Sequence, residues 1–173
     1  YRVYRGNLIL VNSKSPVNQE FKVERLVPAD ENYPYICIEA NAAALLSRLL
    51  EVSGCKDKII PVSGHRNRSE QEKIYSDSIS KNGYKFTLNY VALPGCSEHQ
   101  TGLAIDLGKK SDHIDFIRPE LPYRGEYGLF RYKAAEYGFI ERYKKDKKAF
   151  TGIAPEPWHF RYVGYPHSKI MTE

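Results

Sequence analysis

Apolar residues recur with helical spacing in one early segment of the chain. Residues 39–51 have a helix-forming composition, and the leucines of this segment fall on one face of the expected helix, namely Leu45, Leu46, Leu49 and Leu50. Gly54 lies just beyond them, where a glycine commonly ends a helix. The preceding residues 1–36 are expected to form an extended lead-in, with a strand-like run at 8–11 and polar, turn-rich sequence after it.

The middle of the chain predicts one strand followed by one helix. A short apolar run at residues 59–62 indicates a buried strand. The helix should begin at a cap provided by Asn67 or Ser69 and should end at Asn82-Gly83. Residues 84–98 carry no regular pattern, so we expect them to be irregular.

Strand-like runs gather in the second half of the chain, at residues 102–107, 140–143 and 158–163. Between them, residues 108–124 have the composition of a polar loop and residues 127–137 that of a helix. Because the helices come early and the strands late, we expect an α+β fold with a small antiparallel sheet flanked by helices. The length of 173 residues fits a single domain over residues 1–173.

Charge narrows the choice of partners. The formal net charge is +5, from 26 basic and 21 acidic residues, which is a modest excess. The chain has no clustered arginine face and no RNA-binding signature, so we expect no nucleic-acid partner. The basic run at residues 142–148 is most simply a solvated turn.

The sequence does not determine the cellular compartment of the protein. No run of about 18 apolar residues is present, so we expect no membrane span in this chain. The chain opens at Tyr1 and shows no signal peptide, so a leader or anchor removed by processing is compatible with it. The three cysteines, Cys37, Cys55 and Cys96, cannot form a disulfide framework, because an odd number leaves one thiol unpaired.

The most informative segment is CSEHQTGLAID, at residues 96–106. It places His99 in a loop and Asp106 on the strand that follows, where the two side chains can converge. Gly102 and Ala104 leave room for a backbone or a ligand to approach closely. The pair alone is a weak signal for a metal site. Cys96 and His99 also form a C-x-x-H pair, but no second half of a structural zinc site follows.

A second segment, EPWHF at residues 156–160, completes a candidate metal site. Pro157 disfavours a regular strand there, and a turn would present Glu156 and His159 to the same cavity. Two imidazoles and one carboxylate would leave a fourth position for water, as in catalytic zinc sites. Zinc lowers the pKa of such a water molecule to about 7, and Glu156 could accept the proton that the water loses. Arg66 could stabilise the oxyanion of the tetrahedral intermediate. This set of residues suits hydrolysis of an amide bond.

The same segments resemble a known family. CSEHQTGLAID fits S-x-H-x-x-G-x-A-x-D, and EPWH fits E-x-x-H, of the D-alanyl-D-alanine carboxypeptidases and dipeptidases linked to vancomycin resistance. The chain looks most similar to the VanY and VanXY types. The resemblance extends from about Asn7 to Ser168 and includes the strings VALPGCSEHQ, YGFI and EPWHFRYVG.

The resemblance implies a role for each matching position. It places one zinc ion per chain on His99, Asp106 and His159, the general base on Glu156, and the group that polarises the scissile carbonyl on Arg66. The implied substrates are bacterial peptidoglycan precursor peptides ending in D-Ala-D-Ala. The implied reaction removes the C-terminal D-Ala, with additional dipeptidase activity. The family is compatible with the cytoplasm or with an anchored position outside it.

Further positions match the family's substrate pocket. Ser97 corresponds to a residue that helps to hold the terminal carboxylate of the substrate, and Gln71 to a glutamine of the same pocket. Trp158 is expected to shape the pocket wall beside His159, or to be purely structural.

Two positions depart from the family pattern. His65 stands where a tyrosine commonly precedes the arginine. Ser63 stands where members that act on the free dipeptide tend to carry an acid, which could pair with the ammonium group of the substrate. Because Ser63 has no charge, we expect longer peptide stems to be preferred over free D-Ala-D-Ala.

Other interpretations remain. The same metal site could serve an L,D- or endolysin-type peptidase, because stereochemical preference depends on pocket shape. A non-catalytic wall-binding zinc module is disfavoured, since a structural site needs neither Glu156 nor Arg66. We interpret His113 as a surface residue and His167 as a structural one. The sequence does not fix the oligomeric state.

Overall fold

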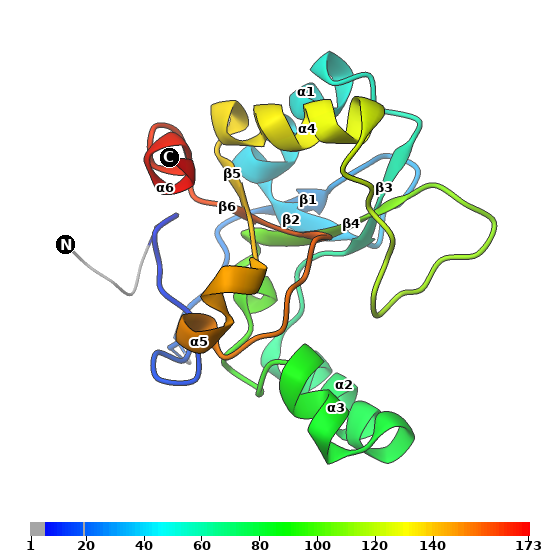
Figure 1. The fold of residues 1–173 in the computed structure, drawn as a ribbon. Helices are drawn as coiled ribbons and strands as arrows, with labels where there is room; N and C mark the ends of the chain where they lie inside the picture. Colours follow the sequence, from blue (N-terminus) through cyan, green and yellow to red (C-terminus); the bar gives the residue numbers. More distant parts are fainter. Residues whose placement is uncertain (1–5, 19) are drawn as a thin grey trace.

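The computed structural model, which describes residues 6–18 and 20–173, is built around a four-stranded antiparallel sheet (Figure 1). Its strands lie in the order β3-β4-β6-β5, with bounds Ile59–Ser63, Ala104–Lys109, His159–Tyr162 and Phe139–Glu141. Strands β1 (Leu26–Pro28) and β2 (Cys37–Glu39) form a separate antiparallel pair. The predicted α+β fold with a small antiparallel sheet is confirmed.

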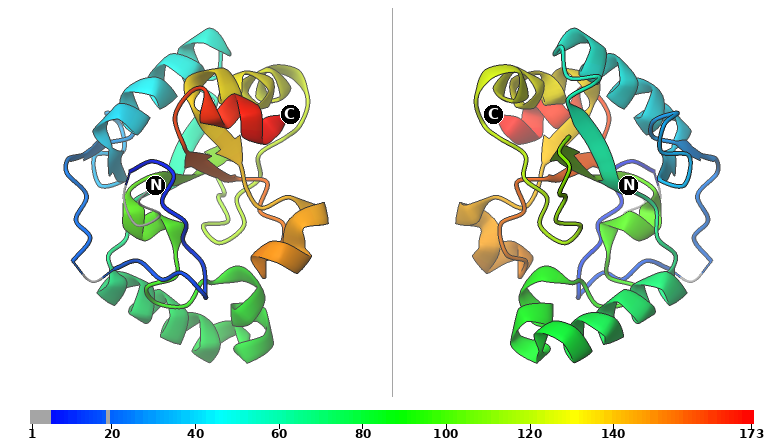
Figure 2. Two further views of the ribbon diagram at one scale, coloured as in Figure 1. Left: turned by 90° about the vertical axis from the view of Figure 1, so that its left-hand side faces the viewer. Right: turned by 90° about the vertical axis from the view of Figure 1, so that its right-hand side faces the viewer.

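Helices lie on both sides of the four-stranded sheet. Figures 1 and 2 show α1 (Ala40–Val52) and α4 (Gly125–Ala134) on one side, and α2 (Arg68–Asn82) with α3 (Tyr84–Tyr90) on the other. The remaining helical segments are short: η1 (Glu98–Thr101), η2 (Ala135–Tyr137), η3 (Lys145–Lys147), α5 (Lys148–Thr151) and α6 (His167–Thr172). Among the described helices, none is both long and apolar enough to cross a membrane.

The hydrophobic core lies between the sheet and helices α1 and α4. The leucine face predicted for α1 is present: Leu46, Leu49 and Leu50 are buried, and Leu45 is partly buried against the core. The core side of α4 contributes Phe130, which packs edge-on against Phe160 of β6, with ring centroids 5.2 Å apart. These contacts cover one face of the sheet and leave the other for the site described below.

Helix α2 begins where the sequence predicts. The Asn67 side chain accepts a hydrogen bond from the Glu70 N–H, and the Glu70 side chain accepts one from the Asn67 N–H, which is a complete capping box. The cap is therefore Asn67 and not Ser69. Gly83 follows the last helical residue with φ 82°, a conformation that favours glycine.

Three predictions about secondary structure are wrong. Residues 84–90 form α3 and are not irregular. The helix packs on α2 through a buried pair of hydroxyl groups, those of Ser78 and Thr87, whose oxygens are 2.8 Å apart. Because this contact is polar, the sequence shows no helical spacing of apolar residues here. The lead-in contains β1, a strand too short to show alternation. The run 8–11 forms no strand, although Ile9 and Val11 are buried. Residues 1–5 and 19 of the lead-in lie outside the described residues.

The interleaving of helices and strands agrees with the predicted segments, since β3 separates α1 from α2 and α4 separates β4 from β5. The expectation of early helices and late strands overlooked the short strand pair β1 and β2 and the C-terminal helix α6.

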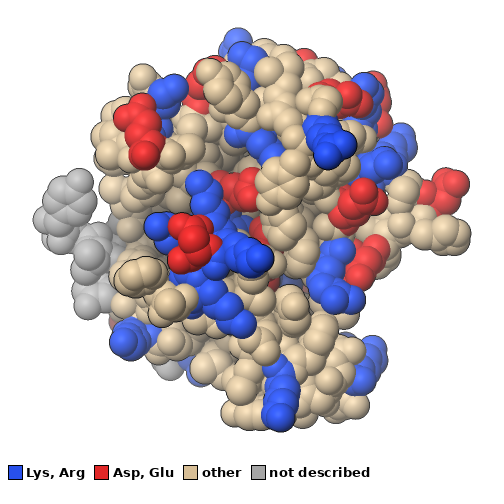
Figure 3. Space-filling view, viewed as in Figure 1, with Lys and Arg blue, Asp and Glu red and all other residues tan. Residues whose placement is uncertain are grey.

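The basic run at 142–148 is largely exposed at its lysines, and Figure 3 shows basic side chains gathered around an acidic one in this region.

A core substitution tests this packing. Replacing Phe130 with alanine should lower the free energy of unfolding by about 3–5 kcal/mol, because the side chain is fully buried and leaves a cavity against Phe160. The control is Tyr132→Ala in the same helix, since Tyr132 is 77% exposed; it should change stability by no more than about 0.5 kcal/mol. Urea unfolding followed by circular dichroism measures both, and equal effects would contradict the assignment of the core.

Candidate metal centre

The register of the sheet brings three polar side chains into one row. Ser63 of β3 pairs with Asp106 of β4, and Asp106 pairs with His159 of β6. Residues that are direct partners in neighbouring strands point to the same face of the sheet. A register shift between Pro61 and Ser63 re-aims the end of β3, as β-bulges commonly do beside functional sites.

His99 reaches the same face from the short η1 helix that precedes β4. The Ser97 Oγ caps this helix by accepting a hydrogen bond from the His99 N–H at 3.3 Å. Gly102 ends the helix with φ 71°, and a Cβ atom there would lie 3.0 Å from a methyl carbon of Val23. Only glycine combines this left-handed turn with so close a neighbour, so the helix can lead directly into β4.

The structure brings the side chains of His99, Asp106 and His159 together. One nitrogen or oxygen atom from each lies within 4.8 Å of the others. His99 Nε2 is 3.2 Å from Asp106 Oδ2, and His159 Nδ1 is 2.9 Å from Asp106 Oδ1. The donor atoms are thus two imidazole nitrogens and a carboxylate oxygen. This is a donor set that zinc commonly takes in catalytic sites.

The orientation of each imidazole is fixed by a contact at the ring nitrogen that faces away from Asp106. His99 Nδ1 lies 2.7 Å from the Gly64 carbonyl oxygen, which can only accept, so Nδ1 carries the hydrogen and Nε2 is free to bind a metal. Gly64 comes so close to the Cys37 carbonyl oxygen of β2 that a Cβ atom would collide with it. The other ring is held by Glu98, whose Oε2 is 3.1 Å from His159 Nε2.

The charges of the cluster suit metal binding. Burial works against ionisation of Asp106, but His99 and His159 hold its pKa far below its usual range, so the carboxylate is ionised. Burial, together with Arg66, lowers the pKa of His99 and keeps it neutral. Burial also acts against a charged His159, whereas hydrogen bonds with Asp106 and Glu98 raise its pKa to about 9. A metal ion would therefore replace a proton at His159 Nδ1.

Glu156 stands beside the cluster on the turn that the sequence predicts. The His159 N–H donates to the Glu156 carbonyl oxygen at 3.0 Å, which closes the turn through Pro157. Glu156 Oε2 lies 3.9 Å from His159 Nδ1. Burial raises the pKa of Glu156 to about 8. A carboxylate with such a pKa can take up a proton near neutral pH and release it again.

A cavity of about 370 Å³ opens onto these groups. Its lining includes the remaining residues predicted for the site, namely Ser63, Arg66, Gln71, Ser97 and Trp158. The Arg66 Nε atom is buried and has no hydrogen-bond partner among the described residues. The Gln71 Nε2 donates to the Ala92 carbonyl oxygen at 2.8 Å, so one amide hydrogen is already engaged.

Several residues lie outside this cavity in the described structure. His113 is exposed in the loop after β4, and His167 begins α6. Neither His65 nor Cys96 is among the cavity-lining residues, and all three cysteines are free thiols. The C-x-x-H pair thus contributes only its histidine to the cluster.

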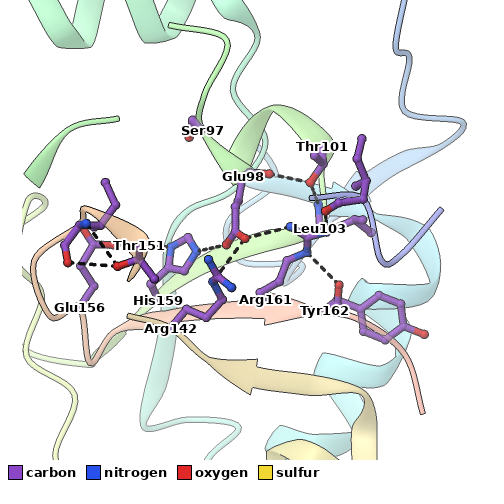
Figure 4. Close-up of polar contacts among 12 residues, drawn as sticks. Ser97, Glu98, Thr101, Leu103, Arg142, Thr151, Glu156, His159, Arg161 and Tyr162 are labelled. Atoms are coloured by element: carbon purple, nitrogen blue, oxygen red, sulfur yellow. Dashed lines mark hydrogen bonds and ion pairs between the residues drawn. The ribbon is translucent and has the colours of Figure 1, made fainter. Parts of the chain in front are cut away.

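Sequence reasoning missed two residues of the site. Glu98 is 4% exposed, and although burial would raise its pKa, Arg161 and His159 lower it to about 2. Tyr143 lines the cavity with its ring centroid 5.3 Å from that of His159. The only signal for Glu98 was its position next to His99, because its partners are 61 and 63 residues away. Figure 4 shows Glu98 between His159 and Arg161.

Comparison with known proteins places this site in a family. The profile described as "VanY: D-alanyl-D-alanine carboxypeptidase" matches residues 36–165, and a bifunctional D-Ala-D-Ala dipeptidase and carboxypeptidase, VanXYC of Enterococcus gallinarum, is 41% identical over 96% of this chain and 88% of its own length. The chain belongs to the VanY family. The resemblance inferred from the two motifs is therefore confirmed.

Solved structures of VanY-family members agree with the fold, and one of them contains zinc. The vancomycin-resistance D,D-dipeptidase VanXYg, solved with a D-Ala-D-Ala phosphinate analogue, shares 52% identity over 98% of this chain and 67% of its own, with a TM-score of 0.95. A VanY variant from a VanB-type resistance cassette was solved with Zn(II), at 29% identity and a TM-score of 0.75; 95% of this chain and 92% of that one are covered. Zinc is thus the metal that the His-Asp-His cluster indicates.

Removal of the shared carboxylate tests the cluster. Asp106→Ala should reduce the zinc content of the protein to near zero, because Asp106 lies within contact distance of both imidazoles. Metal analysis after dialysis measures this. The matched control is His113→Ala, which removes an exposed imidazole and should leave zinc content unchanged. A zinc content of the D106A variant equal to that of the wild type would argue against the cluster.

Proposed function

We propose that this chain is a zinc-dependent D,D-carboxypeptidase. It removes the C-terminal D-Ala from bacterial peptidoglycan precursor peptides ending in D-Ala-D-Ala, has D,D-dipeptidase activity in addition, and contributes to vancomycin resistance. The observation that carries this proposal is the convergence of His99, Asp106 and His159 at a cavity that also holds Glu156. Its membership of the VanY family supplies the substrate class.

In this proposal the three clustered side chains hold one zinc ion per chain. The ion supplies, when bound, a positive charge and a water molecule acidified to a pKa of about 7. Asp106 lies within contact distance of both imidazoles, so its carboxylate would offset the charge of an ion held by the three side chains. The hydrogen bonds behind both rings keep the donor nitrogens directed at one point.

Glu156 acts as the general base and then as the general acid. Its carboxylate takes the proton from the attacking water and delivers it to the nitrogen of the leaving D-Ala. The position of Oε2 beside His159 and the raised pKa of Glu156 support this role. The pKa near neutrality allows both directions of transfer at the same residue.

Arg66 binds the carbonyl oxygen of the scissile bond and stabilises the negative charge that develops there. Its side chain lines the same cavity as Glu156, and its buried Nε atom has no hydrogen-bond partner among the described residues. A donor held ready in a buried site is worth more than one in water, because no solvent has to reorganise.

The substrate's terminal carboxylate is held by Ser97 and Gln71 of the same cavity. Both line the cavity and both are almost fully buried, which fixes their positions. The second amide hydrogen of Gln71 is available for this contact, since the first donates to Ala92. Trp158, at 8% exposure, forms part of the wall beside the cluster.

Substitution of Glu156 tests the mechanism. Glu156→Gln keeps the shape of the side chain but cannot accept the proton, so the kcat for release of D-alanine from a pentapeptide ending in D-Ala-D-Ala should fall about 10²- to 10⁴-fold, with zinc content unchanged. The control is Glu136→Gln, which changes an exposed carboxylate on η2 and should leave kcat at the wild-type value. Unchanged turnover of E156Q would remove Glu156 from the mechanism.

The wild type also tests the stereochemistry of the substrate. If the zinc-loaded wild type releases no D-alanine from the pentapeptide but releases the terminal amino acid of L,D-linked peptides, L,D-carboxypeptidase activity is favoured instead.

The uncharged side chain at position 63 predicts the balance between substrates. Ser63 lines the cavity and is the cross-strand partner of Asp106. Because its side chain is uncharged, the free ammonium group of a dipeptide has no charged partner at this position. The wild type should therefore have a higher kcat/KM on a pentapeptide than on free D-Ala-D-Ala. Ser63→Asp should raise the relative kcat/KM for the dipeptide by about 10- to 100-fold, since one charged hydrogen bond is worth about 1.5–3 kcal/mol. Ser63→Asn, similar in size but uncharged, is the control, and equal ratios in all three proteins would refute the hypothesis.

A further inference from the structure

A buried carboxylate lies directly behind the candidate metal centre. Glu98 is 4% exposed and contacts three charged or titratable side chains (Figure 4). Its Oε2 lies 3.1 Å from His159 Nε2, on the side of the ring that faces away from Asp106. Its Oε1 accepts a hydrogen bond from Arg161 Nη1 at 3.1 Å and lies 3.3 Å from Arg142 Nε.

Arg161 is itself held in place by the main chain. It is 2% exposed, and its Nη2 donates to the carbonyl oxygens of Asn7 and Ile9 at 3.0 and 2.9 Å. Its Nε donates to the Tyr162 carbonyl oxygen at 3.1 Å. The guanidinium therefore joins strand β6 to the lead-in segment. A fixed guanidinium of this kind gives the carboxylate of Glu98 a single position.

We propose that Glu98 is a positioning residue that sets the zinc affinity of the site through His159. A neutral imidazole that binds a metal through Nδ1 must carry its hydrogen on Nε2, and Glu98 accepts that hydrogen. The contact holds Nδ1 toward Asp106 and makes the imidazole a stronger donor. Arg161 and Arg142 compensate the buried negative charge, so the carboxylate stays available to His159.

The geometry distinguishes this role from simple packing. A structural ion pair with Arg161 would occupy Oε1 alone, yet Oε2 is directed at the one ring nitrogen that the metal does not need. Glu98 also sits next to His99 in η1, so one short helix provides both a candidate ligand and the group that orients a second candidate ligand. This role concerns metal binding, so it does not depend on which peptide is the substrate.

Zinc affinity is the direct test. Glu98→Gln keeps the size of the side chain and removes its charge, and it should weaken zinc binding about 10- to 100-fold in a competition titration with a chromophoric chelator. The matched control is Glu141→Gln, which breaks the partly buried ion pair between Arg131 and Glu141 on the neighbouring strand β5. The E141Q variant should lose thermal stability but keep the zinc affinity of the wild type.

The outcomes separate a positioning role from a structural one. If E98Q loses thermal stability as E141Q does but binds zinc as tightly as the wild type, the proposal is overturned. Should E98Q fail to fold, Arg161→Lys replaces it, because lysine keeps the positive charge but cannot reach all the carbonyl groups that hold Arg161 while it also donates to Glu98. A several-fold loss of zinc affinity in R161K supports the proposal, and wild-type affinity overturns it. A wild-type protein that binds zinc but hydrolyses no D-Ala-D-Ala peptide would defeat the proposed function and leave this inference standing.

Discussion

The pairing of β4 with β6 is the constraint on which the site depends. Asp106 and His159 are 53 residues apart in the chain, yet they are direct partners across two antiparallel strands. Side chains in a strand alternate between faces, so a shift of one residue in this register would turn one of the pair toward the opposite face of the sheet. The core side of the same strands, with Ile105, Leu107 and Phe160 buried, holds the register in place. The hydrophobic effect thus positions the polar residues on the other face.

Around this pair the protein buries several charged side chains. Asp106, Glu98, Arg161 and the two imidazoles are all largely removed from water, which is costly unless each charge has a partner. The structure meets this requirement with a chain of contacts that runs from the lead-in carbonyl groups through Arg161 and Glu98 to His159. Glu156 stands beside His159 with its pKa raised by burial to about 8, so it can change protonation state near neutral pH.

The sequence predicted the parts of the molecule whose signals are local. Helix α1, the Asn67 cap of α2 and strand β3 follow from the spacing of leucines, one capping residue and one apolar run. The two motifs contain six of the predicted site residues that line the cavity. Helix α3 was missed because it packs through the hydroxyls of Ser78 and Thr87, which carry no apolar period. Strand β1 was missed because three residues are too few for alternation to be seen. The partners of Glu98 were not predictable, since Arg161 and His159 become its neighbours only when β6 is in place.

The order of the site residues along the chain has a consequence for biosynthesis. His159 and Glu156 are supplied by the last strand of the sheet and the turn before it, whereas Arg66 and His99 are translated much earlier. Proteins emerge from the ribosome N-terminus first, and contacts between distant segments form late. The nascent chain therefore carries two of its three candidate metal ligands and no general base until residues 156–159 have been translated. A ribosome that stalls before residue 156 would release a polypeptide with most of the helices but without the groups needed for hydrolysis.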